Sequence, residues 1–129
     1  MTQRFSYDLE KSPPAPVLPV RIGVGGARRD ATLRALIDTG ADVSLIPARV
    51  ARELRLPVVG QIKIRGVTGR TSVDLYGADL EVAGSSIRVQ LAGLGDEILL
   101  GRDIVNRWII VLRGPERLLE IESVSSDGG

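Results

Sequence analysis

Apolar and polar residues alternate over many short segments of the chain, and this two-residue period is typical of β-strands with one buried face. The strand-like segments span 17–24, 32–37, 61–67, 70–75, 78–82, 87–91, 98–100, 108–112 and 118–121. Glycine-containing turn signals separate several of them, at 25–30, 67–69, 84–86 and 114–115. Many short strands at such close spacing predict a small, mostly β domain, either a barrel or a sandwich.

Two segments have the longer period of a helix. In 47–54 the apolar residues share one face, and Pro47 suits the first turn of a helix. In 103–108 the apolar residues again share a face, and Asp103 suits the capping position. We therefore expect one or two short helices within the β domain.

The two ends of the chain lack a clear period. Residues 11–19 hold four of the seven prolines, which excludes a helix there and predicts an extended segment. We assign 1–16 to a proline-rich N-terminal arm, 17–122 to one folded domain and 123–129 to a flexible tail. A total of 129 residues fits a single domain.

A faint internal repeat links two parts of the domain. Each part offers a hairpin, an apolar strand, a glycine turn and a short helix. The first reaches its glycine turn at 38–40 and its helix at Pro47, and the second reaches them at 101–102 and Asp103. The period is longer than that of solenoid repeats, so it predicts a pseudo-twofold domain.

Composition narrows the possible chemistry. Apolar residues make up 43% and charged residues 26%, with a net charge of +1, so a soluble globular domain with no nucleic-acid or membrane partner is expected. The chain has no Cys and no His, which excludes disulfides, thiolate nucleophiles, histidine-based triads and histidine-based metal sites. Hydrolysis would then require carboxylates, hydroxyls, Lys or an oxygen-liganded metal. The polar N-terminus lacks the apolar core of a signal peptide, so a cytoplasmic location is expected.

The most specific pattern is an apolar strand that ends in a carboxylate. Asp38 follows Leu36-Ile37 and precedes Thr39 and Gly40. Glycine permits a tight turn and brings a bare backbone N–H near the carboxylate, while a threonine hydroxyl can lock the turn. The tripeptide alone also fits an ordinary strand-closing turn, because short motifs often match by chance. The buried strand before it and the residues after it favour a functional site.

A second pattern follows downstream, where an apolar strand at 98–100 ends in Gly101 and Arg102. In this order, 36–42 and 98–103 together resemble the retropepsin family, the retroviral-type aspartic proteases, and the similarity covers roughly 17–122. The resemblance implies a small closed β-barrel of the acid-protease type with one or two short helices, working as a homodimer on peptide or protein substrates without a cofactor. Asp-Thr-Gly occurs once in the chain, so a second copy must supply the other carboxylate.

The resemblance also implies roles for the residues around the carboxylate. Asp38 would be the catalytic aspartate, and two Asp38 side chains sharing one proton would activate a water molecule. Thr39 would join its symmetry mate in a hydroxyl grip beneath the site. Gly40 would bind the substrate main chain, and with Ala41 and Asp42 it would form part of the substrate-binding surface.

Two further sets of residues follow from the same resemblance. Arg102 would pair with Asp42 and, with Asp103, would support the dimer. The hairpin around 64–71 would be a flap over the substrate, although its Arg65 and Arg70 flanks are unusual for a lid over an apolar cleft. Its substrate-binding tip residues would be Gly66, Val67, Thr68 and Gly69.

Two other interpretations stay open. One is a catalytically silent retropepsin-fold module for dimerisation or peptide binding, which would have no need of an intact Asp38-Thr39-Gly40. The other is a carboxylate metal site that uses Asp38 and Asp42, which the absence of His and of a dense acidic cluster disfavours.

Overall fold

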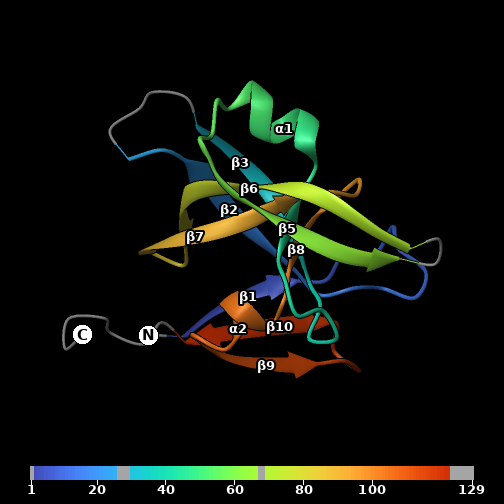
Figure 1. Cartoon of the computed structure of the whole chain (residues 1–129). Coiled ribbons are helices and arrows are strands. Elements are labelled where there is room, and N and C mark those ends of the chain that lie inside the picture. The colour runs from blue at the N-terminus through green and yellow to red at the C-terminus, as the bar shows by residue number, and fades with distance from the viewer. Residues whose placement is uncertain (1, 26–29, 67–68, 123–129) are drawn as a thin grey trace.

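The computed structural model describes residues 2–25, 30–66 and 69–122, and most of these residues belong to β-strands joined by short turns (Figure 1). The tail predicted at 123–129 and the centre of the turn at 26–29 lie outside the described residues. The described elements are β1 (Thr2–Ser6), β2 (Val17–Gly23), β3 (Asp30–Ile37), β4 (Leu45–Ile46), α1 (Ala48–Glu53), β5 (Val58–Gly66), β6 (Gly69–Val82), β7 (Ser85–Gly93), β8 (Ile98–Leu100), α2 (Arg102–Val105), β9 (Ile109–Arg113) and β10 (Leu118–Glu122).

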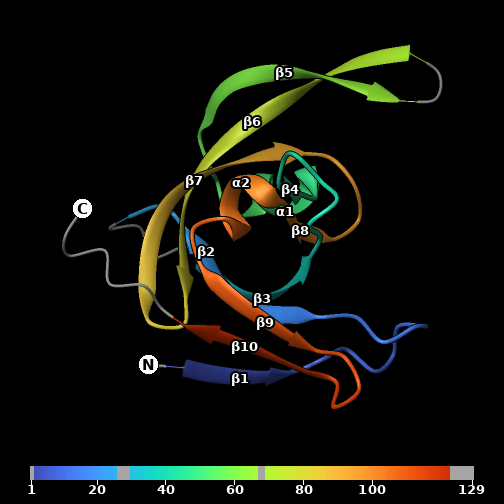
Figure 2. The ribbon, with the colours of Figure 1, turned by 90° about the horizontal axis from the view of Figure 1, so that it is seen from below.

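Six strands close into a barrel, as predicted. Hydrogen bonds connect β2, β3, β8, β4, β7 and β6 in this order, and β6 then pairs back onto β2. The β3–β8 and β4–β7 pairs are parallel, whereas the other pairs of the barrel are antiparallel. The remaining strand, β5, pairs with β6, and the distal part of this hairpin extends away from the barrel (Figure 2).

The apolar residues of the two-residue period are the ones whose side chains are buried inside the barrel. On β2, Leu18, Val20 and Ile22 are almost fully buried, whereas Pro19 and Arg21 between them are exposed. Burying a Leu, Ile or Val side chain stabilises a fold by about 1.5–3 kcal/mol, so a one-residue slip of this strand would cost several such contributions. This penalty fixes the register of β2 against its neighbours.

The ends of the chain form a second, three-stranded antiparallel sheet in the order β1-β10-β9. We refer to it as the terminal sheet. Its Leu119 and Ile121 are buried in the core. Strands at 108–112 and 118–121, with a turn between them, were predicted from the sequence, but the strand at Thr2–Ser6 was not. Part of the segment assigned to an extended arm is therefore a paired strand.

Two other sequence expectations need correction, and one further strand was not predicted. The segments 70–75 and 78–82 are not separate strands, because β6 runs through Gly77, whose N–H donates to Pro57 O at 2.9 Å. The two-residue strand β4 is too short to produce a period. Asp103 does not cap α2, which begins after Gly101 with no side-chain cap. None of the helices in the described part of the chain is long and apolar enough to cross a membrane.

Candidate active site

Asp38 lies where β3 ends beside the parallel strand β8. Leu36 and Ile37 pair with Leu99 and Leu100 of β8, and the Asp38 N–H continues this pairing by donating to Leu100 O at 3.0 Å. Ile37 is buried and Asp38 is half-buried. The buried part of β3 therefore fixes the backbone of Asp38 and delivers its carboxylate to the surface of the barrel.

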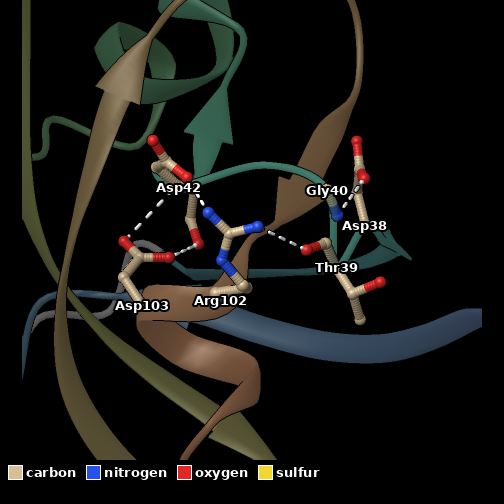
Figure 3. Close-up of polar contacts among 7 residues, drawn as sticks. Asp38, Thr39, Gly40, Asp42, Arg102 and Asp103 are labelled. Atoms are coloured by element: carbon tan, nitrogen blue, oxygen red, sulfur yellow. Dashed lines mark hydrogen bonds and ion pairs between the residues drawn. The ribbon is translucent and has the colours of Figure 1, made fainter.

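The turn after β3 orients this carboxylate. The Gly40 N–H donates to Asp38 Oδ1 at 2.9 Å, and the Ala41 N–H donates to Asp38 O at 3.2 Å (Figure 3). A Cβ atom at position 40 would lie 3.2 Å from Asp38 Oδ1, so glycine gives this approach the room that it needs. Asp38 Oδ2 accepts no hydrogen bond from the residues that the structure describes. One oxygen is thus held and the other is left for a reactant.

Thr39 is exposed, and Figure 3 shows its side chain pointing away from that of Asp38. Its carbonyl oxygen accepts a hydrogen bond from Arg102 Nη1 at 2.9 Å. Its hydroxyl makes no hydrogen bond within the described part of this chain. The turn therefore presents one carboxylate oxygen and one hydroxyl that have no partner among the described residues.

Arg102 holds the same turn from the other side, lying between Asp42 and Thr39 (Figure 3). Its guanidinium forms the predicted ion pair with Asp42, and its backbone N–H donates to Ala41 O at 2.9 Å. The side chains of Arg102 and Asp42 are 48% and 79% exposed. An ion pair this exposed contributes about 0–1 kcal/mol, so the backbone bond is the more dependable support.

Sequence reasoning missed Ser44, which is fully buried at the end of the turn. Its hydroxyl donates to Asp103 Oδ1 at 2.6 Å, its N–H donates to Asp103 Oδ2 at 3.2 Å, and its Oγ accepts from the Gly101 N–H at 2.9 Å. Asp103 therefore anchors the turn after β3 instead of capping α2. The available signal was a serine within the apolar run Val43-Ser44-Leu45, because a buried hydroxyl needs partners.

Gly101 stands at the closest approach of the two turns. A Cβ atom there would lie 2.7 Å from Ala41 O and 3.1 Å from Val43 O. Its φ of −88° is open to any residue, so lack of space and not backbone conformation requires glycine. The two sequence patterns that were paired by resemblance are thus in direct contact.

The predicted flap is the β5–β6 hairpin, which ends at the Gly66–Gly69 pair. Val67 and Thr68, the other predicted tip residues, lie outside the described residues. Arg65 and Arg70 are directly opposite each other on the fully exposed face of the hairpin. The apolar pair Ile62–Val73 lies on the other, half-buried face. The two arginines that were unusual for a lid therefore point away from its apolar face.

The carboxylates of the site are engaged separately. Asp38 accepts from Gly40, and Asp42 pairs with Arg102. Over residues 2–25, 30–66 and 69–122, no three acidic side chains gather closely enough to hold a metal ion. The metal interpretation therefore finds no third carboxylate in this part of the chain.

Comparisons with known proteins agree with this geometry. A family model described as aspartyl protease matches residues 18–104. The EIAV protease in complex with the inhibitor HBY-793 is 28% identical, with a TM-score of 0.58, and the match covers 79% of this chain and 92% of that one. No curated protein matches the chain.

Two further solved structures are similar in fold. The retropepsin-like aspartic protease from Rickettsia conorii has a TM-score of 0.64 at 13% identity, covering 94% of this chain and 90% of that one. The Simian Foamy Virus (mac) protease has a TM-score of 0.54 at 22% identity, covering 70% of this chain and 92% of that one.

Proposed function

Because the chain belongs to the aspartyl protease family, we propose that it is a homodimeric endopeptidase of the retropepsin type, with one Asp38 from each subunit at a shared site. The observation that carries the proposal is the geometry of Asp38. Its backbone is fixed by β8, one carboxylate oxygen is held by Gly40, and the other has no partner among the described residues. A carboxylate held in this way keeps one oxygen free to bind a water molecule or a substrate.

One carboxylate cannot act as base and acid on an amide in the same step. Two of them within hydrogen-bonding reach share one proton, because two like charges so close cannot both persist. The ionised Asp38 takes a proton from water while the water oxygen bonds to the carbonyl carbon. The protonated Asp38 gives its proton to the carbonyl oxygen. Collapse of the tetrahedral intermediate with proton transfer to the nitrogen breaks the C–N bond.

A twofold dimer gives the unpaired groups of the turn their partners. Each Thr39 hydroxyl, exposed in one chain, would bond across the axis to the turn of the other subunit. Gly40, Ala41 and Asp42 would then line the substrate groove beside the two carboxylates. The β5–β6 hairpin would cover an extended peptide and offer main-chain hydrogen bonds to it.

The decisive variant is Asp38→Asn, which keeps the shape of the side chain but removes its charge. We expect peptide cleavage to fall by about 10²- to 10⁴-fold or more, while sedimentation still shows a dimer. Glu116→Gln is the matched control, because it makes the same chemical change at an exposed turn between β9 and β10. Full cleavage by Asp38→Asn would overturn the mechanism.

A mixing experiment tests whether two chains share one site. An excess of Asp38→Asn chains added to wild type should lower activity far below the value expected from dilution, because the mixed dimers contain only one functional carboxylate. Undiminished activity would indicate that one chain suffices. If wild-type protein dimerises and binds peptides but cleaves none of a peptide library, the silent binding module is the better interpretation.

A further inference from the structure

We infer that the outer edge of β5 binds an extended segment of the substrate polypeptide in which acidic and apolar residues alternate, and which lies outside the residues that reach the carboxylates. This inference rests on the proposed protease and adds a second contact that selects its substrates. β5 is the last strand of its sheet, so one side of it has no strand neighbour in the described residues (Figure 2). A free strand edge offers N–H and C=O groups to an extended peptide.

The outer face of the β5–β6 hairpin carries positive charge. Lys63, Arg65 and Arg70 are exposed, and the strand register places all three on this face. Within the part of the chain that the structure describes, none of the three forms an ion pair. These cations are therefore available to a partner.

The hairpin has little negative charge of its own. Over 61–66 and 69–74 the single carboxylate is that of Asp74, at the base of the hairpin, where it accepts a hydrogen bond from Gln61 Nε2 at 3.0 Å. Arg65 and Arg70 are directly opposite each other, and like charges in this position destabilise a strand pair. A carboxylate from another chain placed beside them would relieve this repulsion.

The spacing of the side chains defines the segment that fits. Lys63 and Arg65 are two positions apart on one strand, which corresponds to about 7 Å. A strand laid beside β5 has the same period, so its acidic residues would face these cations at alternate positions. Ile62 and Ile64, which alternate with them, are half-buried on the opposite face. The intervening residues of the added strand would extend that face and should be apolar.

Charge also argues against other occupants of this edge. Pairing β5 with β5 of a second copy would bring Lys63 and Arg65 together with the same cations, and such repulsion is how edge strands avoid self-association. A nucleic acid or an anionic membrane calls for a broad basic surface. The chain has a net charge of only +1, and these three cations lie on one hairpin. A short acidic polypeptide segment matches the patch in size and sign.

The kinetic test attaches such a segment to a substrate. A cleavable peptide from a library is extended, through a Gly-Ser linker at either end, with Glu-Val-Glu-Val or with Gln-Val-Gln-Val. The acidic extension at the favoured end should raise kcat/KM about three- to tenfold over the neutral one, as two exposed ion pairs would.

Two double variants locate the effect. Lys63→Gln/Arg65→Gln should abolish the preference for the acidic extension. Arg52→Gln/Arg117→Gln should keep it, because this control removes the same charge from exposed positions on α1 and in the β9–β10 turn. Equal kcat/KM for the two extensions in wild type, or loss of the preference in the control, would overturn the β5 site.

A binding measurement separates this inference from catalysis. A fluorescent Glu-Val repeat peptide should bind the full-length Asp38→Asn protein, and adding Lys63→Gln/Arg65→Gln should abolish that binding. A peptide of the same composition with its Glu residues consecutive should bind less well, because fewer of them face the cations. Equal binding of the two peptides, or tighter binding of a DNA oligonucleotide or of phosphatidylserine vesicles, would overturn the β5 site. Specific binding of the repeat peptide by a wild-type protein that cleaves no peptide would instead support the site and remove the proposed protease.

Discussion

The turn after β3 and the turn after β8 are built alike but perform different tasks. Each follows a strand of the parallel β3–β8 pair and leads toward a short helix. The first turn presents Asp38 and the Thr39 hydroxyl outward. The second turn has Gly101 and Arg102 in the corresponding place and directs its polar groups at the first turn. In the proposed homodimer, one chain would therefore hold half of a symmetric site together with the support for that half.

The support uses two kinds of interaction of unequal strength. Backbone N–H groups of Gly101 and Arg102 bind buried Ser44 and Ala41 O, respectively. The guanidinium of Arg102 binds exposed Asp42. Losing a partner of a buried hydrogen bond costs about 1–3 kcal/mol, whereas an exposed ion pair contributes about 0–1 kcal/mol. The contrast predicts that an added side-chain atom between the two turns lowers stability and activity more than the removal of their charged groups.

Gly101→Ala should have the largest effect, because its Cβ would lie 2.7 Å from Ala41 O. The two turns must move apart, and we expect a loss of about 1–3 kcal/mol in the free energy of unfolding. A displacement of about 1 Å in the catalytic turn should lower kcat/KM by about 10²-fold. Urea unfolding and peptide kinetics measure both effects.

Gly114→Ala is the control for this variant. It adds the same atom in the β9–β10 turn, where nothing lies within 4 Å of the new Cβ. Stability and activity should both stay near wild type. If Gly101→Ala behaves like Gly114→Ala, the second turn does not position the first.

Arg102→Ala should have a smaller effect. It removes the Asp42 ion pair and the hydrogen bond to Thr39 O but keeps the backbone bond to Ala41 O. We expect unfolding free energy to change by about 0–1 kcal/mol and kcat/KM to fall by about tenfold, the equivalent of about 1.4 kcal/mol. Asp42→Asn separates the two contacts, because it weakens the ion pair and leaves the bond to Thr39. A loss as large as that of Gly101→Ala would contradict the ranking.

The alternation of buried positions along the strands, as at Leu18, Val20 and Ile22, predicted a barrel or a sandwich. The resemblance to the retropepsin family then selected the closed barrel. The sequence did not predict β1, whose single large apolar residue, Phe5, produces no period. That strand forms because β10, more than a hundred residues away, offers it a full ladder. Long-range pairing of this kind leaves no local signal.

The same distinction holds for the site. Asp38 was predicted because Asp-Thr-Gly after an apolar strand is a local pattern. Ser44 was missed because its importance comes from Gly101 and Asp103, which lie 57 and 59 positions away. A serine in an apolar run indicates a buried hydroxyl but not its partner. Contacts between the two turns therefore became visible only once the strands were placed side by side.

The smallest predicted effect concerns the stability of the terminal sheet. Ion pairs of Glu120 with Arg4 and Arg113 there add to the backbone hydrogen bonds between the strands. The hydrogen bond from Arg113, followed by that from Arg4, lowers the pKa of the Glu120 carboxyl below its ordinary value of 4.5. A lowered folded-state pKa gives stability that is fully present above the unfolded value and is lost as pH falls through the folded value. The ion pairs therefore stabilise the sheet above about pH 4.5 and weaken at more acidic pH.

Comparison of wild type with Glu120→Gln isolates this contribution. Urea unfolding at pH 6 should show the variant to be less stable than wild type, and the difference should shrink as the pH is lowered below 4.5, because the unfolded chain then binds a proton at this carboxyl. Glu122→Gln is the control, because Glu122 is an exposed residue of the same strand. A gap between wild type and Glu120→Gln that does not change with pH would show that the stabilisation does not come from the ionised carboxyl of Glu120.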